Sequence, residues 1–156
     1  MPTFDIPGTG ELNLDHLVLD YNGTLAVDGV LLPGGAADLR RLAETLSIQV
    51  LTADTFGMAG EGLADLPCAL AVLPPGEQDL AKRDVVRKLG AAQCACIGNG
   101  RNDRLMLAEA GLGIAVILGE GAAGVTVTAA DVVCTSITAA LALLRKPLRL
   151  AATLRC

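Results

Sequence analysis

The stretch Leu17-Val-Leu-Asp-Tyr-Asn-Gly-Thr-Leu25 decides the fold of this 156-residue chain. Three apolar residues run into Asp20, and a turn that contains glycine follows at once. This pattern predicts a buried strand with a carboxylate at its carboxyl end, which is the edge where open α/β sheets bind ligands. An aspartate there can act as a nucleophile toward phosphorus or as a hard oxygen ligand of Mg²⁺.

Short apolar runs alternate with segments of helical spacing along the rest of the chain. Strands are predicted over 48–52, 69–73, 93–97, 112–118 and 131–134. Helices are predicted from Pro33 onward and over 56–64, 77–89, 103–110 and 136–144. Residues 4–6 are predicted as an edge strand, and residues 25–32 as a hairpin with Asp28-Gly29 at its tip. This alternation is typical of a doubly wound, mainly parallel α/β sheet.

The chain is predicted to form a single domain over residues 1–156. No linker, repeat or low-complexity tract divides the chain. About 30 residues separate Asp20 from Thr52, and about 30 more lead to Lys82, whereas an independent domain usually needs at least about 50 residues. We therefore expect only the small hairpin after Asp20 in these intervals, and no separate cap domain inserted over this edge of the sheet.

Composition excludes several classes of function. Aromatic residues make up only 2% of the chain, and 17 acidic residues against 12 basic ones give a net charge of -5. Neither stacking on nucleic-acid bases nor binding to a phosphate backbone is expected. No leader pattern and no apolar run of membrane-spanning length is present, so we expect a cytoplasmic protein with no membrane partner.

The five cysteines are predicted to be free thiols. An odd count without paired spacing argues against a disulfide framework and for a reducing compartment. Cys94 and Cys96 alternate on one predicted strand and have no histidine nearby, so core packing is favoured over binding of a soft metal.

Three further polar positions follow Asp20 in a fixed order. Thr52 ends a strand, Lys82 opens a helical segment, and Gly98-Asn-Gly-Arg-Asn-Asp103 follows another strand. This series resembles the haloacid dehalogenase superfamily from about Leu17 to about Leu144. Within the superfamily it is most similar to the phosphorylation domain of P-type ATPases and to small soluble proteins that resemble that domain.

The resemblance implies a Mg²⁺-dependent phosphatase that forms an aspartyl-phosphate on Asp20 and acts on a small phosphorylated molecule. Thr52 and Lys82 would hold the phosphoryl oxygens, with Lys82 also balancing the carboxylates. Nearby residues that would contribute to substrate binding are Gly23, Thr24 and Ala53. Residues that would hold the metal are Asp20, Asn22 through its backbone carbonyl, Asn99 and Asp103.

Two departures from the family pattern affect the expected chemistry. Asn22 stands where phosphatases of the family commonly carry a second aspartate, and an amide cannot shuttle a proton. General acid–base catalysis is typically worth about 10²–10⁴ in rate, or roughly 3–5 kcal/mol of barrier. Asn99 stands where the fourth motif usually begins with an acid, and an amide oxygen is a weaker Mg²⁺ ligand than a carboxylate.

These departures leave two hypotheses open. One is a slow phosphatase that works best on acyl or aryl phosphates, whose leaving groups need no protonation. The other is a catalytically lapsed phosphate-binding or regulatory protein. An ATPase-like unit is not expected, because no nucleotide-binding domain fits in 156 residues. Capless relatives commonly form tetramers that cover the site, so we expect a homo-oligomer such as a tetramer.

Gly119-Glu-Gly-Ala-Ala-Gly124 matches the fingerprint of a dinucleotide-binding loop and follows a predicted strand. The next residues, Val-Thr-Val-Thr, are poor helix starters, and no acid lies about 20 residues on to hold a ribose. A flexible glycine-rich connector is the favoured interpretation.

Overall fold

A six-stranded parallel sheet forms the centre of the computed structural model, which describes residues 1–156. The stretch that decides the fold forms β3 in the middle of the sheet. The order is β10-β9-β8-β3-β6-β7, so the chain adds strands on one side of β3 and then crosses to the other. The bounds are β3 (His16–Leu19), β6 (Ser47–Thr52), β7 (Ala69–Val72), β8 (Cys94–Gly98), β9 (Leu112–Val116) and β10 (Val132–Cys134). The predicted doubly wound α/β fold is confirmed.

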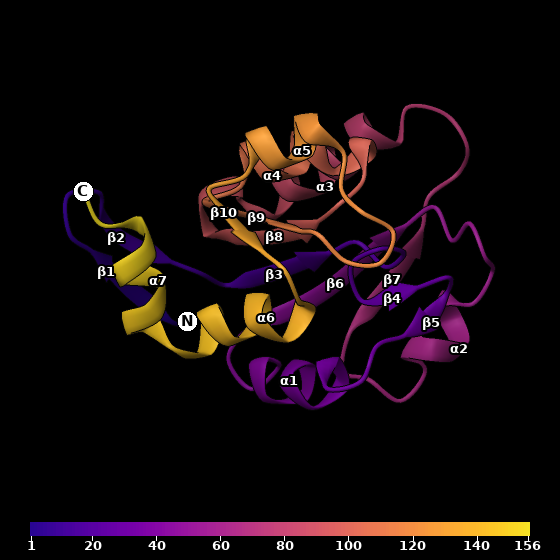
Figure 1. Cartoon of the computed structure of the whole chain (residues 1–156), viewed down its shortest axis with the longest axis horizontal. Helices are drawn as coiled ribbons and strands as arrows, with labels where there is room; N and C mark the ends of the chain where they lie inside the picture. The colour runs from indigo at the N-terminus through magenta and orange to yellow at the C-terminus, as the bar shows by residue number, and fades with distance from the viewer.

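Helices cover both faces of the sheet (Figure 1). One face carries α1 (Gly35–Leu42) and α6 (Ile137–Arg145). The other face carries α3 (Gln78–Leu89), α4 (Arg104–Glu109) and α5 (Gly124–Ala129). None of the helices has the length and apolar character needed to span a bilayer.

The side chains of β3 alternate between two cores. Leu17 and Leu19 belong to a cluster of 28 buried residues on the side of α1 and α6. Val18 belongs to a smaller cluster on the side of α3 and α4, which also contains Cys94 and Cys96. Both cysteines are completely buried there, which confirms their predicted packing role.

Two small hairpins lie at opposite ends of the sheet (Figure 1). β4 (Ala26–Val27) and β5 (Val30–Leu31) form the predicted hairpin after Asp20, next to α2 (Ala59–Leu63). β1 (Thr3–Ile6) pairs with β2 (Gly10–Asn13) instead of extending the main sheet, so the prediction of an edge strand is wrong in this respect. Phe4 and Ile6 are buried in the main core, beside α7 (Pro147–Leu154), and this burial draws β1 away from the sheet edge.

The elements near the carboxyl terminus differ from the prediction. The strand predicted over 112–118 ends at Val116, and the chain then turns through a single bridge between Leu118 and Gly121. The predicted connector leads directly into α5, and α7 was not expected. Two short 3₁₀ turns, η1 (Ala91–Gln93) and η2 (Arg101–Asp103), flank β8.

Candidate active site

The carboxyl ends of β3, β6 and β8 meet where the strand order reverses. Leu19 at the end of β3 is in register with Val50 of β6 and Ile97 of β8. The N–H of Asp20 donates to the carbonyl of Ile97 at 3.0 Å, which extends the ladder to the acid itself. Such a reversal opens a crevice in doubly wound sheets, and Asp20 lies at its base.

A tight turn follows Asp20 and brings the chain back over the strand end. The carbonyl of Tyr21 accepts the N–H groups of Thr24, Leu25 and Ala26 at 2.9–3.2 Å. Gly23 has a φ of 79°, and a Cβ at this position would collide with the side-chain amide of Asn99. The turn therefore requires glycine both for its left-handed backbone and for its close approach to the loop after β8.

Lys82 on α3 reaches the carboxylate of Asp20 from the face of the sheet that α3 covers, and it is completely buried. Its Nζ lies 2.8 Å from Oδ1 of Asp20 and 2.6 Å from Oδ1 of Asp103. Burial alone would lower the pKa of the Lys82 ammonium, but the charges of Asp103 and Asp20 outweigh it and raise the pKa above its ordinary value. Lys82 is therefore a cation shared between two carboxylates.

Burial and, to a smaller extent, the neighbouring charge of Asp103 together raise the pKa of Asp20 from 3.8 to about 7. The ammonium of Lys82 lowers this pKa but does not cancel the increase. The second oxygen of Asp20, Oδ2, lies 3.5 Å from the hydroxyl of Thr24, at the limit of a hydrogen bond. A cation bound beside Asp20 would favour the ionised, nucleophilic carboxylate.

Asp103 is completely buried, and both of its oxygens are occupied. Oδ1 accepts from Lys82, while Oδ2 accepts the N–H groups of Asn99 at 3.0 Å and Gly100 at 2.9 Å. A Cβ at Gly98 would overlap this carboxylate, so glycine lets the loop close around it. In this arrangement Asp103 fixes the loop and the lysine, and its contact with a metal stays a prediction.

A polar hollow with a volume of about 190 Å³ opens above this cluster. Its walls include five of the predicted site residues, namely Asp20, Asn22, Thr52, Ala53 and Asn99. The other four do not line it, namely Gly23, Thr24, Lys82 and Asp103, and all four are buried. Their direct contact with a substrate stays a prediction.

The hollow also has walls that were not among the predicted site residues. Thr55, Asn102 and Glu120 line it, together with Gly100 of the predicted loop. Gly100 and Asn102 belong to the loop that carries Asp103, so their place in the motif could have indicated them. Glu120 lies in the glycine-rich segment 119–124, for which the sequence predicts only a flexible connector.

The glycine-rich segment 119–124 is fastened to the site. The side-chain amide of Asn99 donates to the carbonyl of Gly121 at 2.9 Å, and the N–H of Ala123 donates to the carbonyl of Asn99 at 2.8 Å. The hydroxyl of Thr126, in α5, donates to the carbonyl of Gly100 at 2.7 Å. These hydrogen bonds make the segment a wall of the hollow.

The oxygen atoms at the hollow fit a hard cation such as Mg²⁺. Oδ1 of Asn22 is buried and has no hydrogen-bond donor, and Oδ1 of Asn99 accepts only the Thr24 hydroxyl at 3.3 Å. The carboxylate of Asp20 lines the same hollow. No group of three or more His, Cys, Asp or Glu side chains suited to a metal occurs in the chain. A cation here would therefore depend largely on neutral oxygens.

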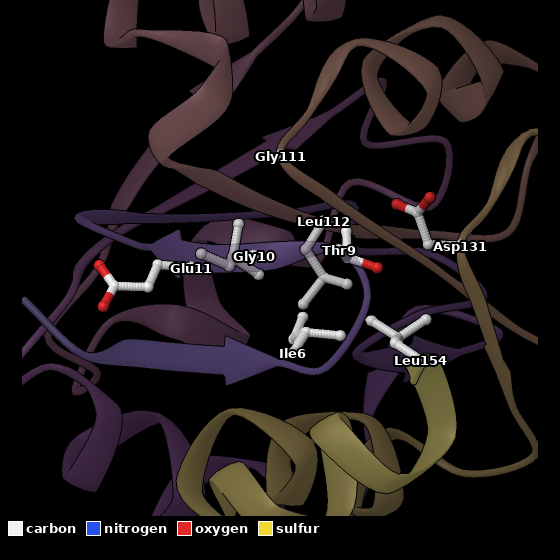
Figure 2. A pocket seen from close by; sticks show the side chains of 9 residues that line it. Ile6, Thr9, Gly10, Glu11, Gly111, Leu112, Asp131 and Leu154 are labelled. Atoms are coloured by element: carbon white, nitrogen blue, oxygen red, sulfur yellow. The ribbon is translucent and has the colours of Figure 1, made fainter. Parts of the chain in front are cut away.

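A second hollow lies at the opposite end of the sheet, between the β1–β2 hairpin, the start of β9 and the end of α7 (Figure 2). Ile6, Leu112 and Leu154 point together at its centre, and the carboxylate of Glu11 points away from them. The carboxylate of Asp131 accepts the N–H of Gly113 at 2.7 Å. This hollow therefore has an apolar centre without the charged cluster found at Asp20.

Comparison of the structure with solved structures identifies the fold. The 3-deoxy-D-manno-octulosonate 8-phosphate phosphatase of Moraxella catarrhalis, solved with magnesium, phosphate and KDO, has a TM-score of 0.72 at 19% identity. The match covers 87% of this chain and 88% of that one. The chain has the haloacid dehalogenase fold.

Two further neighbours agree on this fold. The cobalt-bound deoxy-D-mannose-octulosonate 8-phosphate phosphatase (YrbI) of Haemophilus influenzae has a TM-score of 0.70 at 21% identity, covering 90% of each chain. A haloacid dehalogenase hydrolase of subfamily III A from Legionella pneumophila has a TM-score of 0.72 at 17% identity, covering 90% of this chain and 87% of that one.

A relative found by sequence shows the family to which this chain belongs. Uncharacterized protein MJ0073 of Methanocaldococcus jannaschii is 40% identical over 84 residues, which are 51% of this chain and 90% of the relative. The chain therefore belongs to one family with MJ0073. No family model matches the sequence.

Proposed function

We propose that the protein is a Mg²⁺-dependent phosphohydrolase that acts on a small phosphorylated molecule through an aspartyl-phosphate on Asp20. The observation that carries this proposal is the buried cluster in which Lys82 joins Asp20 to Asp103 at the base of a polar hollow. The fold neighbours support it, since they include phosphatases solved with magnesium or cobalt.

The proposed reaction has two steps. An oxygen of Asp20 attacks phosphorus, and the bond between phosphorus and the leaving-group oxygen breaks. Water then hydrolyses the aspartyl-phosphate, which releases phosphate and restores the carboxylate. Asp20, Asn22 and Asn99 would hold Mg²⁺, and Asp103 would support these residues from behind. The bound cation would supply positive charge to the phosphoryl oxygens.

Donors around the hollow would hold the phosphoryl group in line for attack. The hydroxyl oxygen of Thr52 accepts the N–H of Asp54 at 2.9 Å, so its own hydrogen is free to donate into the hollow. Asn102 also lines the hollow and carries an amide that can donate. Lys82 would keep Asp20 oriented and balance the charge of the cluster.

Asn22 sets the expected speed of the proposed reaction. It occupies the hollow with an amide that cannot protonate a leaving group or activate water. We therefore expect slow turnover, with acyl and aryl phosphates favoured because their leaving groups need no protonation. A persistent phosphoenzyme would also fit the resemblance to the phosphorylation domain of P-type ATPases.

A second candidate function is binding of phosphate without turnover, in a regulatory role. Its specific support is the pair of amides, Asn22 and Asn99, at positions where the family commonly carries acids. The absence of a convergent acidic group also favours weak metal binding. This alternative predicts phosphate binding that survives without any hydrolysis.

We further propose a cytoplasmic homo-oligomer in which a second copy covers the open hollow. Exposed apolar side chains support this assembly, namely Val30 in the hairpin and Phe56 and Met58. Sizing chromatography tests it, and a monomeric elution would contradict it.

Hydrolysis of p-nitrophenyl phosphate and acetyl phosphate tests the proposed function. The assays compare Mg²⁺ with EDTA and the natural protein with Asp20→Asn, and mass spectrometry follows phosphorylation of Asp20. Metal-dependent turnover that Asp20→Asn abolishes is the expected result. Calorimetric binding of inorganic phosphate without turnover on either substrate would instead support the regulatory alternative. 3-Deoxy-D-manno-octulosonate 8-phosphate, the phosphate ester in the names of two neighbours, is a further compound to assay.

A further inference from the structure

Glu120 is the ionisable side chain of the hollow that has no charged partner. Only Asp20 and Glu120 are ionisable among the residues that line the hollow, and neither lysine nor arginine is among them. Asp20 shares the ammonium of Lys82 with Asp103, whereas no salt bridge involves Glu120. A bound molecule that extends beyond its phosphate therefore meets a negative wall.

The position of Glu120 is fixed by the loops on both sides. Its own segment is fastened to Asn99 by two hydrogen bonds, and Thr126 in the following helix is fastened to Gly100 by a third. Its Oε2 accepts the N–H of Asp28, at the tip of the β4–β5 hairpin, at 3.2 Å. Its Oε1 makes no hydrogen bond within the protein, so this oxygen is free to accept one from a bound molecule.

Glu120 forms no salt bridge, and no lysine or arginine lines the hollow beside it. Asp28, whose N–H holds it, carries a second exposed carboxylate at the hairpin tip. The whole chain also has a net charge of -5. This rim would repel a leaving group that carries a carboxylate or a second phosphate, and it would attract one that carries an ammonium group.

We propose that Glu120 determines specificity by accepting a hydrogen bond from an ammonium group on the leaving group of the substrate. The substrate class is then a phosphate monoester with one anionic group and an amine a few atoms from the phosphate. This inference rests on the proposed function of the hollow as a phosphate site. It assigns the glycine-rich segment a role in selecting the substrate.

Two phosphate esters of similar size, whose leaving groups carry opposite charges, test the inference. They are 2-aminoethyl phosphate and carboxymethyl phosphate, compared by their kcat/KM values. We expect the natural protein to prefer the amine by about tenfold, since an exposed carboxylate attracts the ammonium group and repels the carboxylate of the other ester only modestly. Glu120→Gln should reduce the preference to about threefold or less, and Glu120→Lys should reverse it.

Glu11→Gln is the charge-matched control. Glu11 lies at the opposite end of the sheet, beside the apolar hollow of Figure 2, and it is exposed. This variant removes the same charge from the protein and should keep the natural preference between the two substrates. Raising the salt concentration to about 1 M should weaken the preference of the natural protein, because salt screens exposed charges.

Binding of two phosphonates separates this inference from the proposed function. Calorimetry compares 2-aminoethylphosphonate with phosphonoacetate, neither of which needs to be hydrolysed. A preference for the amine that Glu120→Lys reverses supports the inference even where no phosphate ester is turned over. Equal binding of the two phosphonates, or equal kcat/KM for the two esters, in all variants overturns the inference about Glu120. The proposed phosphatase function would still stand in that case if Asp20→Asn abolished turnover. Absence of binding by both phosphonates overturns the inference as well.

Discussion

The ammonium of Lys82 lies 2.8 Å from the carboxylate of Asp20 and 2.6 Å from that of Asp103, with all three groups buried. Two carboxylates thus share one cation at the end of the central strand. Each group depends on the others, because a buried charge without a partner is costly. The same contacts that orient Asp20 therefore also bear on the stability of the fold.

Replacing Lys82 by methionine should destabilise the protein by about 3–5 kcal/mol, because it leaves two buried carboxylates without their partner. The free energy of unfolding in urea, measured at pH 8, checks this. Lys88→Met is the matched control, since Lys88 lies exposed on the same helix and should cost less than about 0.5 kcal/mol. Equal losses in both variants would show that the cluster does not contribute to stability.

The charge of Asp20 should weaken the fold as the pH rises. Its pKa is about 7 in the folded protein against 3.8 for the ordinary side chain, so the folded state binds the proton more tightly. Stability contributed by this proton is complete below pH 4 and is lost between about pH 4 and pH 7. Asp20→Asn cannot ionise and should be more stable than the natural protein by about 1–3 kcal/mol at pH 8, with little difference at pH 4.

Urea unfolding in EDTA at the two pH values measures this effect of Asp20→Asn. The EDTA matters because a bound cation would stabilise the ionised carboxylate and hide the difference. A gain of the same size at pH 4 and pH 8 would assign it to the amide's hydrogen bonds and not to ionisation.

Gly23→Ala should disturb the metal site as well as the turn. The left-handed backbone alone costs roughly 1–2 kcal/mol, and the new Cβ would push against the amide of Asn99. Gly57→Ala is the matched control, because Gly57 also has a positive φ of 67° but has open space at its Cβ position. Only Gly23→Ala should reduce the rise in Tm that Mg²⁺ produces, measured by thermal unfolding at increasing metal concentration.

Parallel pairing explains why the centre of the site could be predicted from the sequence. Asp20, Thr52 and Asn99 each follow an apolar run, and the carboxyl ends of adjacent parallel strands lie at one edge of the sheet. What the pattern could not give is the direction of each side chain. Asp103 turns inward to Lys82 and to two backbone N–H groups. Its contact with a metal, which the family resemblance implies, stays a prediction.

Tertiary contacts explain why the segment around Glu120 could not be predicted. Val-Thr-Val-Thr at 125–128 favours strands by local propensity, yet it forms most of α5. Thr126 is completely buried, and its hydroxyl donates to Gly100, 26 residues away in the chain. Hydrogen bonds between such distant loops leave no periodic pattern in the sequence. The glycine-rich segment therefore could not be recognised as a wall of the site.

Asn22→Asp should speed the proposed hydrolysis, because it places a group that can carry a proton in the hollow beside Asp20. A gain of at least about tenfold in kcat is expected for an alkyl phosphate, whose leaving group needs a proton, out of the roughly 10²–10⁴ that general acid–base catalysis can provide. Acetyl phosphate should gain less in its first step, since acetate leaves without protonation. Asn102→Asp, which adds the same charge to another wall of the hollow, is the control and should not reproduce the gain. Steady-state assays of all three proteins on both substrates decide the matter, and an equal change on the two substrates would locate the slow step outside proton transfer.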